Sequence, residues 1–432
     1  MQNLAQARSN ILWDNRVPYS NLMKALFGSS LIAYYPQSET SGTVVTDVSG
    51  NDRHGVYDGG SLANTISPVN NPCPTYTTPI GGINLVNSGI PAVFNGDEGG
   101  FFSLIKLKDL AQWTNAVQDK LMYIVVDASN SYQLHRPANS NYIICTRVGN
   151  NTVKTVYSYL YPTEWVDVLA TWSVSANVLR IYLNGICQYD LASSTAIATN
   201  FIGTPTIARL YAQNSVPTSL NMQGWGSDAM LFNRLVTDAE ALQVSKIMNP
   251  RLKTLSFIGD SITANSNGLK FPQLIGNERN GGAWRRINHA VSGHRILDHM
   301  AAQVAACVSD NADEIIIALG ANDYNAGNMT TLQAIVEAGI IALKASNPNA
   351  NIYYINVLPV WTNTGGGTEV DKSNIRTAIS AACTAQSITC WDTHTTPWIS
   401  ASETYDGLHP TVLPLATSGH RKIANQMLAR LP

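Results

Sequence analysis

The hydrophobic pattern of this chain changes abruptly near residue 250, and this change constrains the fold more than any other feature. Between about residues 30 and 235, short runs of alternating apolar and polar residues recur, separated by Gly, Asn, Asp and Ser. From residue 253 onward, apolar runs of strand length alternate with segments in which apolar residues recur every three or four positions. The first pattern is typical of antiparallel sheets and the second of a parallel sheet covered by helices. The sequence therefore predicts a multidomain protein, with an all-β domain followed by an α/β domain.

Two domains of ordinary size fit into the 432 residues of this chain. Asn249-Pro250 ends a short helical segment, because proline cannot continue a helix. We therefore predict an N-terminal arm at residues 1–29, a β-sandwich domain at residues 30–249 and an α/β domain at residues 250–432.

The first domain contains several short runs with the two-residue period of half-buried strands. Leu31–Tyr35, Met122–Val126 and Leu179–Leu183 are the clearest of them. Asn184-Gly185 follows the last run, and this pair favours a type I′ hairpin turn, in which both central residues have positive φ. Many short antiparallel strands in one domain predict a sandwich or jelly roll.

Several segments of the first domain share their order and character with one known family. They are Ala33–Pro36, Glu39–Thr43, Asp47–Gly55, Ala92–Gly96, Trp165–Thr171, Leu179–Gly185 and Ala229–Leu235, followed by Thr237–Glu240. Together they resemble laminin-G-like, concanavalin-type jelly rolls. The resemblance implies an all-β jelly-roll sandwich. Thr237 and the acidic residues after it also predict the start of a helix.

The resemblance leaves the role of this domain open, because some members of that family bind glycans, sometimes through calcium, and others are purely structural. Asp47, Asp52, Asp97 and Glu98 are the candidate ligands for a structural calcium ion, since calcium prefers carboxylate oxygens. Acidic residues in turns are also often simply solvated. Glycan binding, calcium binding and a scaffold role therefore all remain alternatives.

Four apolar runs in the second domain have the length of buried strands, at residues 255–258, 314–319, 352–358 and 388–391. Apolar residues at helical spacing lie between and after them and include Leu332, Ile335, Val336, Ile340, Leu343, Ile423, Met427, Leu428 and Leu431. Strands that are buried on both faces and separated by helices indicate a parallel sheet in a three-layer α/β sandwich. Ligands of such sheets bind at the carboxyl ends of the strands.

Polar residues follow these strands at the edge where a ligand site is expected. Ser261 follows the first run in a Gly-Asp-Ser triplet and can act as a nucleophile. Asn322 follows the second run and Gly293 precedes it; an Asn amide and a Gly backbone N–H there can donate to an oxyanion. Asp406 stands three residues before His409, a spacing that lets the carboxylate orient the imidazole toward a serine.

These blocks occur in the order found in SGNH (GDSL-type) hydrolases, which residues 250–432 resemble. The resemblance implies a flavodoxin-like α/β fold and a serine esterase that needs no cofactor for catalysis. It assigns Ser261 as the nucleophile, Asp406 as the acid and His409 as the base. It also assigns the oxyanion hole to the backbone N–H groups of Ser261 and Gly293 and to the side chain of Asn322.

Histidines and cysteines give no pattern typical of a metal site. His289, His294 and His299 recur every five residues, about 140° apart on a helix, so we do not expect them to share a metal ion. The cysteines are scattered, at Cys73, Cys145, Cys187, Cys307, Cys383 and Cys390. Only the last two are close enough in sequence to suggest a disulfide, and the sequence does not decide whether they form one.

Other residues near the predicted site have roles that the sequence specifies less sharply. Asp260 and Asp323 are expected to shape their loops rather than to react. Trp361 and the glycine-rich residues 362–368 follow a predicted strand at the same edge of the sheet. This segment is either a substrate lid or a plain connection.

Charge and hydropathy exclude several kinds of partner. The formal net charge of −2 gives no electrostatic basis for binding nucleic acid or an anionic membrane. No apolar run reaches the roughly 18 residues of a membrane span, and residues 1–8 lack the pattern of a secretory signal. We expect extracellular or virion-associated action, or otherwise a cytoplasmic location.

These observations lead to one expected function and two alternatives. We expect a serine esterase that removes acyl groups such as acetyl from a carbohydrate, with the jelly roll as a glycan-targeting or scaffold domain. A broad carboxylesterase or lipase acting on small or lipid esters is the first alternative. The second is a phage tail or cell-surface receptor-binding protein with accessory esterase activity, which would favour a homotrimer. The sequence specifies neither the acyl chain nor the alcohol portion of the substrate.

Overall fold

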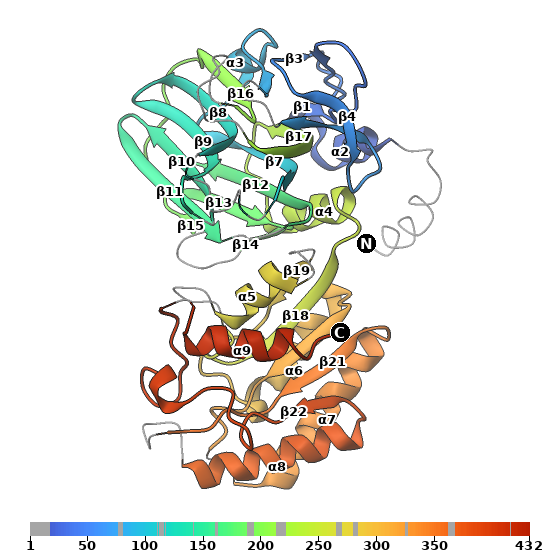
Figure 1. Ribbon diagram of the computed structural model, residues 1–432, viewed down its shortest axis with the longest axis vertical. Helices are drawn as coiled ribbons and strands as arrows, with labels where there is room; N and C mark the ends of the chain where they lie inside the picture. The colour runs from blue at the N-terminus through green and yellow to red at the C-terminus, as the bar shows by residue number, and fades with distance from the viewer. Residues whose placement is uncertain are drawn as a thin grey trace. The chain divides into compact units, whose positions relative to one another are not determined.

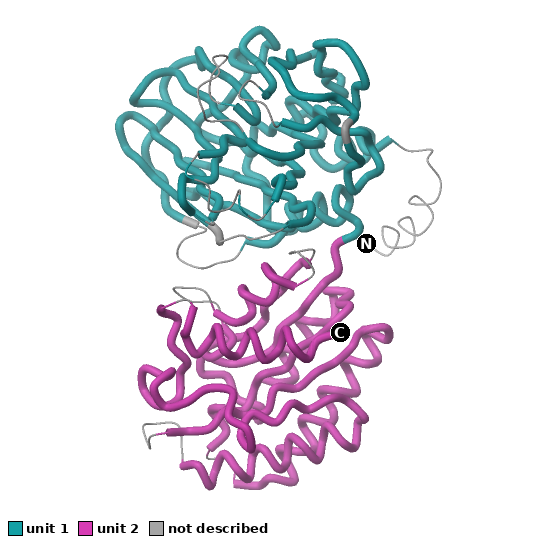
Figure 2. Tube along the Cα trace, in the orientation of Figure 1, with its two compact units in different colours: residues 1–251 teal, residues 252–432 magenta. Residues whose placement is uncertain are grey.

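The chain divides into two compact units, residues 1–251 and residues 252–432 (Figure 2). The computed structural model describes residues 18–76, 81–109, 111, 116, 118–140, 142–159, 163–187, 194–212, 222–264, 270–279, 284–324, 327–361, 368–414 and 416–432. Each unit has its own sheets and its own hydrophobic core, so the two are described separately.

Two antiparallel sheets form the first unit (Figure 1). The first sheet has the order β14 (Ile186–Cys187), β13 (Val178–Leu183), β12 (Val166–Ser173), β7 (Glu98–Leu107), β17 (Gly224–Phe232), β5 (Pro72–Tyr76) and β4 (Ser61–Ile66), with β1 (Leu31–Tyr35) beside β17 and β15 (Ser194–Thr195) beside β13. The second has the order β11 (Thr152–Tyr159), β10 (Tyr142–Gly149), β9 (Asn130–Arg136), β8 (Asp119–Asp127), β16 (Ile207–Leu210), β6 (Ile83–Asn84), β3 (Gly55–Tyr57) and β2 (Val44–Val45). The predicted jelly-roll type of architecture is confirmed.

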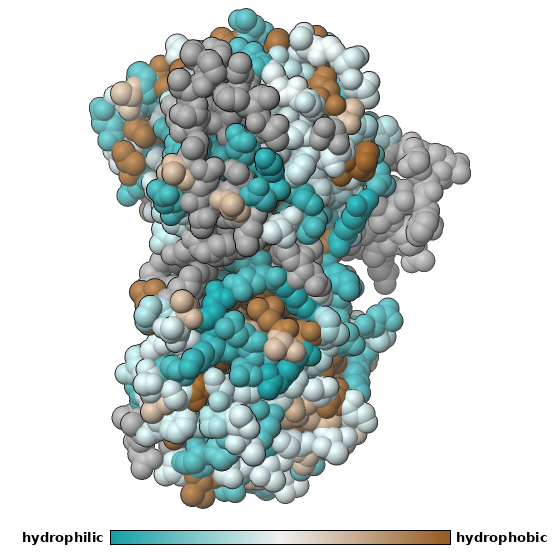
Figure 3. All heavy atoms as spheres, in the orientation of Figure 1, coloured by the Kyte–Doolittle hydropathy of each residue, from teal (hydrophilic) through white to brown (hydrophobic). Residues whose placement is uncertain are grey.

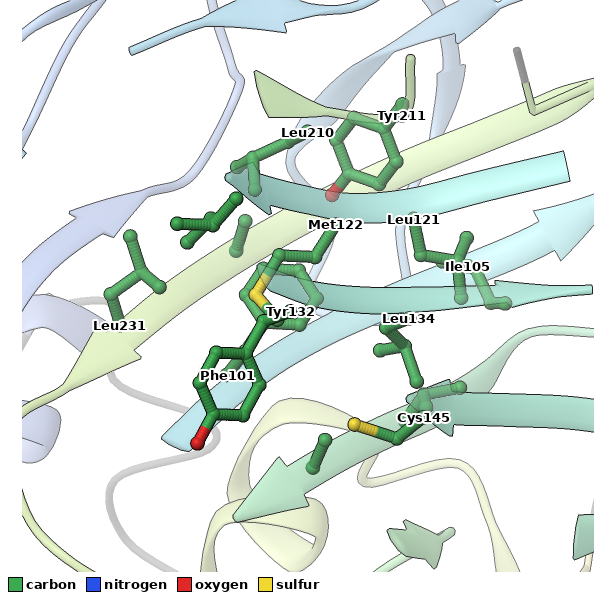
Figure 4. Packing of buried hydrophobic residues seen from close by; sticks show 14 of the residues in the cluster. Phe101, Ile105, Leu121, Met122, Tyr132, Leu134, Cys145, Leu210, Tyr211 and Leu231 are labelled. Carbon is green, nitrogen blue, oxygen red and sulfur yellow. The ribbon is translucent and has the colours of Figure 1, made fainter. Parts of the chain in front are cut away.

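The core of the first unit lies between the two sheets. Because successive side chains of a strand point to opposite faces, Phe101 and Ile105 of β7 face this core, while Phe102 and Leu104 face the other side. Figure 4 shows side chains from both sheets packed together, among them Leu134 of β9. Burial of large apolar side chains on both faces of β7 therefore provides much of the stability of this unit.

Helices cover the outer face of β7. Helix α2 (Tyr19–Phe27) buries Met23 and Phe27, which lie four residues apart and so on one helical face, and the Phe27 ring lies 4.3 Å from that of Phe232. Helix α4 (Asp238–Met248) begins with the predicted cap, a capping box between Thr237 and Glu240. Part of the segment that we assigned to an arm is thus a helix docked on the sandwich.

Short elements complete the first unit. They are η1 (Gly28–Ser30) and α3 (Ile90–Val93). The predicted hairpin joins β13 to β14, and Asn184 and Gly185 have φ values of 51° and 78°. Positive φ at both central positions confirms the type I′ prediction.

A five-stranded parallel sheet forms the centre of the second unit. Its order is β19 (Trp284–Asn288), β18 (Lys253–Gly259), β20 (Glu314–Ala318), β21 (Asn351–Ile355) and β22 (Thr389–Trp391). The second strand along the chain lies outside the first, and the later three follow on the other side. This is the flavodoxin-like order, in which the direction of winding reverses between β18 and β20.

Helices cover both faces of this sheet (Figure 1). Helices α5 (Phe271–Glu278) and α9 (Gly419–Leu428) pack together, and Phe271 contacts Phe257 of β18. Helices α6 (Ile296–Cys307), α7 (Met329–Ser346) and α8 (Glu369–Ala385) bury their apolar faces against Ile315 and Ile317 of β20. The short helices η4 (Val308–Asp310) and η5 (Ala401–Glu403) complete the unit. The predicted three-layer α/β fold is confirmed.

None of the helices within the described ranges is long and apolar enough to cross a membrane. On the face shown in Figure 3, hydrophobic residues lie in small groups between hydrophilic ones on both units.

Candidate active site

Ser261, His409 and Asp406 meet at the carboxyl edge of the parallel sheet. Ser261 follows the last residue of β18 by two positions. Its Oγ lies 2.8 Å from Nε2 of His409, and Nδ1 of His409 lies 2.6 Å from Oδ2 of Asp406. An ionised carboxylate can only accept, so Nδ1 carries the proton and Nε2 accepts from the serine hydroxyl. This chain of hydrogen bonds has the arrangement of a nucleophile, a base and an orienting acid.

The Asp406 carboxylate is held ionised by its own loop. Its Oδ1 accepts from the backbone N–H groups of Leu408 at 2.9 Å and His409 at 2.7 Å. Burial acts to raise the pKa of Asp406, but these bonds and the bond from the His409 ring hold that pKa below its usual value. A charged Asp406 can therefore stabilise an imidazolium when His409 takes up a proton.

The loop that carries Asp406 and His409 is closed on itself. Thr404 pairs with Pro410 in an isolated bridge, and Tyr405 N–H donates to the His409 carbonyl at 3.1 Å. Gly407 has a φ of 82°, a left-handed conformation that favours glycine. This closure fixes Asp406 and His409 relative to one another.

Gly293 and Asn322 lie on adjacent loops of the same edge. Val291–His294 forms a tight turn in which His294 N–H donates to the Val291 carbonyl at 3.2 Å, and Gly293 at its third position has a φ of 81°. A type II turn needs positive φ at that position, which favours glycine. Asn322 Nδ2 donates to the His294 carbonyl at 3.0 Å, so its amide is anchored beside the Gly293 turn and retains a second N–H for another acceptor.

All five predicted site residues lie within one segment that matches a known family. Residues 257–413 match the model of the GDSL-like lipase/acylhydrolase family. The second unit contains a GDSL-like domain. No curated protein matches the chain significantly.

Solved structures resemble each unit separately. A GDSL-like lipase from Parabacteroides merdae is 21% identical, with 41% of this chain and 96% of its own covered and a TM-score of 0.33. The binding domain of botulinum neurotoxin serotype D is 16% identical, with 52% of this chain and 54% of its own covered and a TM-score of 0.39. Domain 4 of a GH43 extracellular arabinanase from Geobacillus stearothermophilus is 13% identical, with 50% and 98% covered and a TM-score of 0.39. The chain thus spans about half the length of the neurotoxin binding domains that it matches.

Two buried aspartates hold the loops of the GDSL-like domain in place. Asp260 accepts from the backbone N–H groups of Ile262 at 3.1 Å and Ala321 at 3.2 Å. These bonds join the loop that carries Ser261, here called the nucleophile loop, to the loop that carries Asn322, here called the Asn322 loop. Burial raises the pKa of Asp260 to about 6, although both bonds oppose this shift. Asp323 accepts from two backbone N–H groups at the start of α6, at 2.8 and 3.2 Å. Both aspartates shape loops, as expected from the sequence.

Two polar residues of the GDSL-like domain that the sequence analysis did not single out also contact the nucleophile loop. Gln303 of α6 bonds both the N–H of Gly259, at 2.8 Å, and its carbonyl, at 2.9 Å. Lys270 donates to the Ser261 carbonyl at 2.5 Å, and burial lowers the pKa of Lys270 to about 8. Neither lies in a short motif, so only their burial after folding reveals them.

In the sequence analysis we compared His289, His294 and His299 as residues of one helix, and this was wrong because α6 begins only at Ile296. His294 lies in the preceding turn, and its ring stacks on that of His299 with the centroids 3.9 Å apart. His289 instead bonds Oδ2 of Asp310 at 2.7 Å. Within the described ranges, the one group of three potential metal ligands combines His289, Asp310 and Cys307, with ligand atoms within 4.8 Å of one another. Asp310 Oδ2 also accepts from Ser256 at 2.6 Å, so hydrogen bonds within the protein already satisfy that oxygen.

The four candidate calcium ligands do not gather into one group among the residues that the structure describes. Asp47 accepts from the backbone N–H groups of Tyr34, Ser49 and Arg53 and from the Ser49 hydroxyl. Protein donors thus occupy both of its oxygens.

Two further predictions concern residues near the active site. Trp361 donates its backbone N–H to the Gly407 carbonyl at 2.9 Å and so adjoins the loop that carries Asp406 and His409, whereas residues 362–367 of the predicted lid lie outside the described residues. Cys383 and Cys390 are free thiols in hydrogen-bonding contact.

Proposed function

We propose that the GDSL-like domain hydrolyses carboxylic esters through a covalent acyl-enzyme on Ser261. The family match supports an ester hydrolase. The observation that carries the proposal is the hydrogen-bonded series from Ser261 Oγ through the His409 ring to Asp406, with distances of 2.8 and 2.6 Å.

The proposed reaction uses each of these groups in turn. Ser261 Oγ attacks the ester carbonyl while its proton passes to His409 Nε2, and Asp406 stabilises the imidazolium. His409 then protonates the departing alcohol, and a water molecule activated by His409 releases the acid from Ser261. The net result is addition of water across the ester bond, with the enzyme restored.

The developing oxyanion needs fixed donors. We assign the backbone N–H groups of Ser261 and Gly293 and the Asn322 amide to this role. The bond from Asn322 to the His294 carbonyl supports the assignment, because it orients the amide next to the Gly293 turn before substrate binds.

We further propose that the alcohol portion of the substrate is a carbohydrate. Tyr405 supports this, because 71% of its surface is exposed and its ring lies almost parallel to that of His409, with the centroids 5.5 Å apart. Trp361, which is 38% exposed, adjoins the same loop through Gly407. Exposed aromatic rings at a catalytic centre offer flat apolar faces on which a sugar ring can stack.

The decisive experiment compares the wild type with Ser261→Ala on aryl esters of graded chain length and on acetylated polysaccharides. Ser256→Ala is the matched control, because Ser256 lies on β18, the strand that ends two residues before Ser261, and its hydroxyl donates to the buried Asp310. We expect Ser261→Ala alone to abolish turnover. Equal hydrolysis by wild type and Ser261→Ala would exclude the serine mechanism. Turnover of aryl esters or lipid esters without release of acetate from polysaccharide would exclude the carbohydrate substrate.

We also propose that the jelly roll targets the enzyme to glycan. Ser261→Ala protein keeps this domain intact and should be retained on columns of the substrate polysaccharide. A lack of retention would contradict glycan targeting and favour a scaffold role for the jelly roll.

A further inference from the structure

Lys372 of α8 is fully buried, although it belongs to none of the motif blocks that define the site. Its ammonium group donates to the backbone carbonyl of Ala321, the residue directly before Asn322. The ring of Tyr324 lies 5.4 Å from the same nitrogen. A buried lysine is unfavourable unless its charge is compensated, so its surroundings decide what it does.

Two buried carboxylates compensate Lys372, and both hold loops of the site. Asp260 and Asp323 act on Lys372 electrostatically, together with Asp371 of its own helix. Asp260 joins the nucleophile loop to Ala321 N–H, and Asp323 joins the Asn322 loop to the start of α6. The ammonium thus bonds the carbonyl of Ala321 while Asp260 accepts from the N–H of the same residue.

This arrangement fixes the two peptide units that flank Ala321, one through its N–H and the other through its carbonyl. The Ala321 carbonyl belongs to the peptide unit whose nitrogen is that of Asn322, so rotation of this peptide would move the Asn322 side chain. A misplacement of about 1 Å at a catalytic group can cost about 10²-fold in rate. Because Lys372 is fully buried, bulk water does not reach its ammonium group and cannot take over its bond to the Ala321 carbonyl.

We propose that Lys372 is a positioning residue for the oxyanion hole, and that it sets the Asn322 amide by holding the Ala321 carbonyl between the nucleophile loop and α8. The proposal rests on the proposed esterase function for its kinetic consequence. Its structural consequence, an ordered loop at residues 320–324, is independent of the reaction.

The kinetic test compares Lys372→Met with Arg279→Met. Arg279 is also buried and paired, with Glu314 and the Pro432 carbonyl, but Glu314 begins β20, at the end of the sheet away from the site. We expect Lys372→Met to lower kcat by about 10- to 100-fold with KM nearly unchanged. We expect Arg279→Met to lower the melting temperature but to leave kcat within about threefold. Equal kcat values for the two variants would overturn the proposal.

The pH profile separates positioning from general stability. Burial lowers the pKa of Lys372 to about 8, so the wild type should lose kcat as pH rises through that value and Lys372→Met should lack this step. The charged and titratable groups around Lys372 are Asp260, Asp323, Asp371 and Tyr324. Lys270 and His409 interact with Asp260, and Arg295 interacts with Asp323. Lys270 also has a pKa lowered to about 8, so Lys270→Met must keep the step that Lys372→Met loses.

Hydrogen exchange tests the same idea without the reaction. Peptides that contain residues 320–324 should exchange faster in Lys372→Met than in Arg279→Met. Unchanged exchange there would overturn the proposal even if the wild type hydrolyses no ester. If Lys372→Met does not fold, Lys372→Gln, which keeps a donor but no charge, replaces it in all three measurements.

Discussion

Asp228 of the jelly roll and Asp260 of the GDSL-like domain are both buried, and they differ in what they hold. In the jelly roll, Asp228 accepts from the hydroxyl groups of Tyr34 and Ser227, and burial raises its pKa to about 6. In the GDSL-like domain, burial raises the pKa of Asp260 to the same value, but Asp260 accepts from backbone N–H groups of two loops. Equal burial and equal pKa therefore do not indicate equal roles. The partners of a buried charge show whether it joins strands of a framework or positions a reactive edge.

The largest effect is expected at Asp406, which we propose as the acid that orients His409. Asp406→Asn should lower kcat by about 10³–10⁴-fold, because an amide cannot hold His409 in the tautomer that accepts from Ser261. Asp97→Asn in the jelly roll is the matched control, since the Asp97 and Asp406 side chains are 39% and 37% exposed. Steady-state kinetics should show no loss for Asp97→Asn. A similar loss of kcat in both variants would contradict the assignment of the reaction to the GDSL-like domain alone.

Removal of one oxyanion donor should have the next largest effect. Asn322→Ala should lower kcat by about 10²–10³-fold with little change in KM, because the amide acts on charge that develops only in the transition state. In the jelly roll, Asn184→Ala removes an amide that accepts from Asp167 N–H, and it should lower the melting temperature but not kcat. An unchanged kcat in Asn322→Ala would remove Asn322 from the oxyanion hole.

Asp260 and Asp228 provide the most direct test of whether buried aspartates in the two units have different roles. Asp260→Asn should lower kcat by about tenfold or more, since an amide can accept one of the two N–H bonds but not both. Asp228→Asn should leave kcat unchanged and act on stability alone. Kinetics on both variants, with melting temperatures as the reference, decide between these outcomes.

The stability effect of Asp228 has a definite dependence on pH. Because its folded-state pKa is raised, its contribution is most favourable below the unfolded-state value of about 4 and is lost as pH rises through about 6. The loss corresponds to about 3 kcal/mol. Calorimetric scans between pH 4 and pH 7 should show a smaller decline in the unfolding transition of the jelly roll for Asp228→Asn than for the wild type. An equal decline would show that Asp228 does not titrate in this range.

The smallest effect concerns calcium in the jelly roll. Protein donors occupy both oxygens of Asp47, so a chelator should leave the melting temperature unchanged, while Asp47→Asn should lower it by removing backbone acceptors. Stabilisation by added calcium would contradict this expectation.

Local patterns in the sequence were enough to predict the fold and to predict that the site residues lie close together. Ser261, Gly293 and Asn322 each follow or precede an apolar strand, and parallel strands bring their carboxyl ends to one edge. Helix α2 was missed because Met23 and Phe27 make only one repeat of a helical pattern, and its docking depends on the sheet that it covers.

Burial of polar residues was the part that local sequence could not reveal. Lys372 lies in an amphipathic helix next to Asp371, where a lysine usually faces water. Its burial results from the position of α8 over the Asn322 loop, which is a consequence of tertiary packing. The stacking of His294 on His299 was missed for a related reason, since the first residue of α6 could not be located within one turn.

The contact between Ser261 and His409 joins positions that are 148 residues apart. Contacts of such long range form late, because the intervening chain must first be ordered. As the chain is synthesised, the loop at residues 404–410 follows every strand of the parallel sheet. The serine therefore has no base until this last loop closes on a finished sheet. A partly folded chain in which this loop has not yet closed therefore lacks the contact between His409 and the Ser261 hydroxyl.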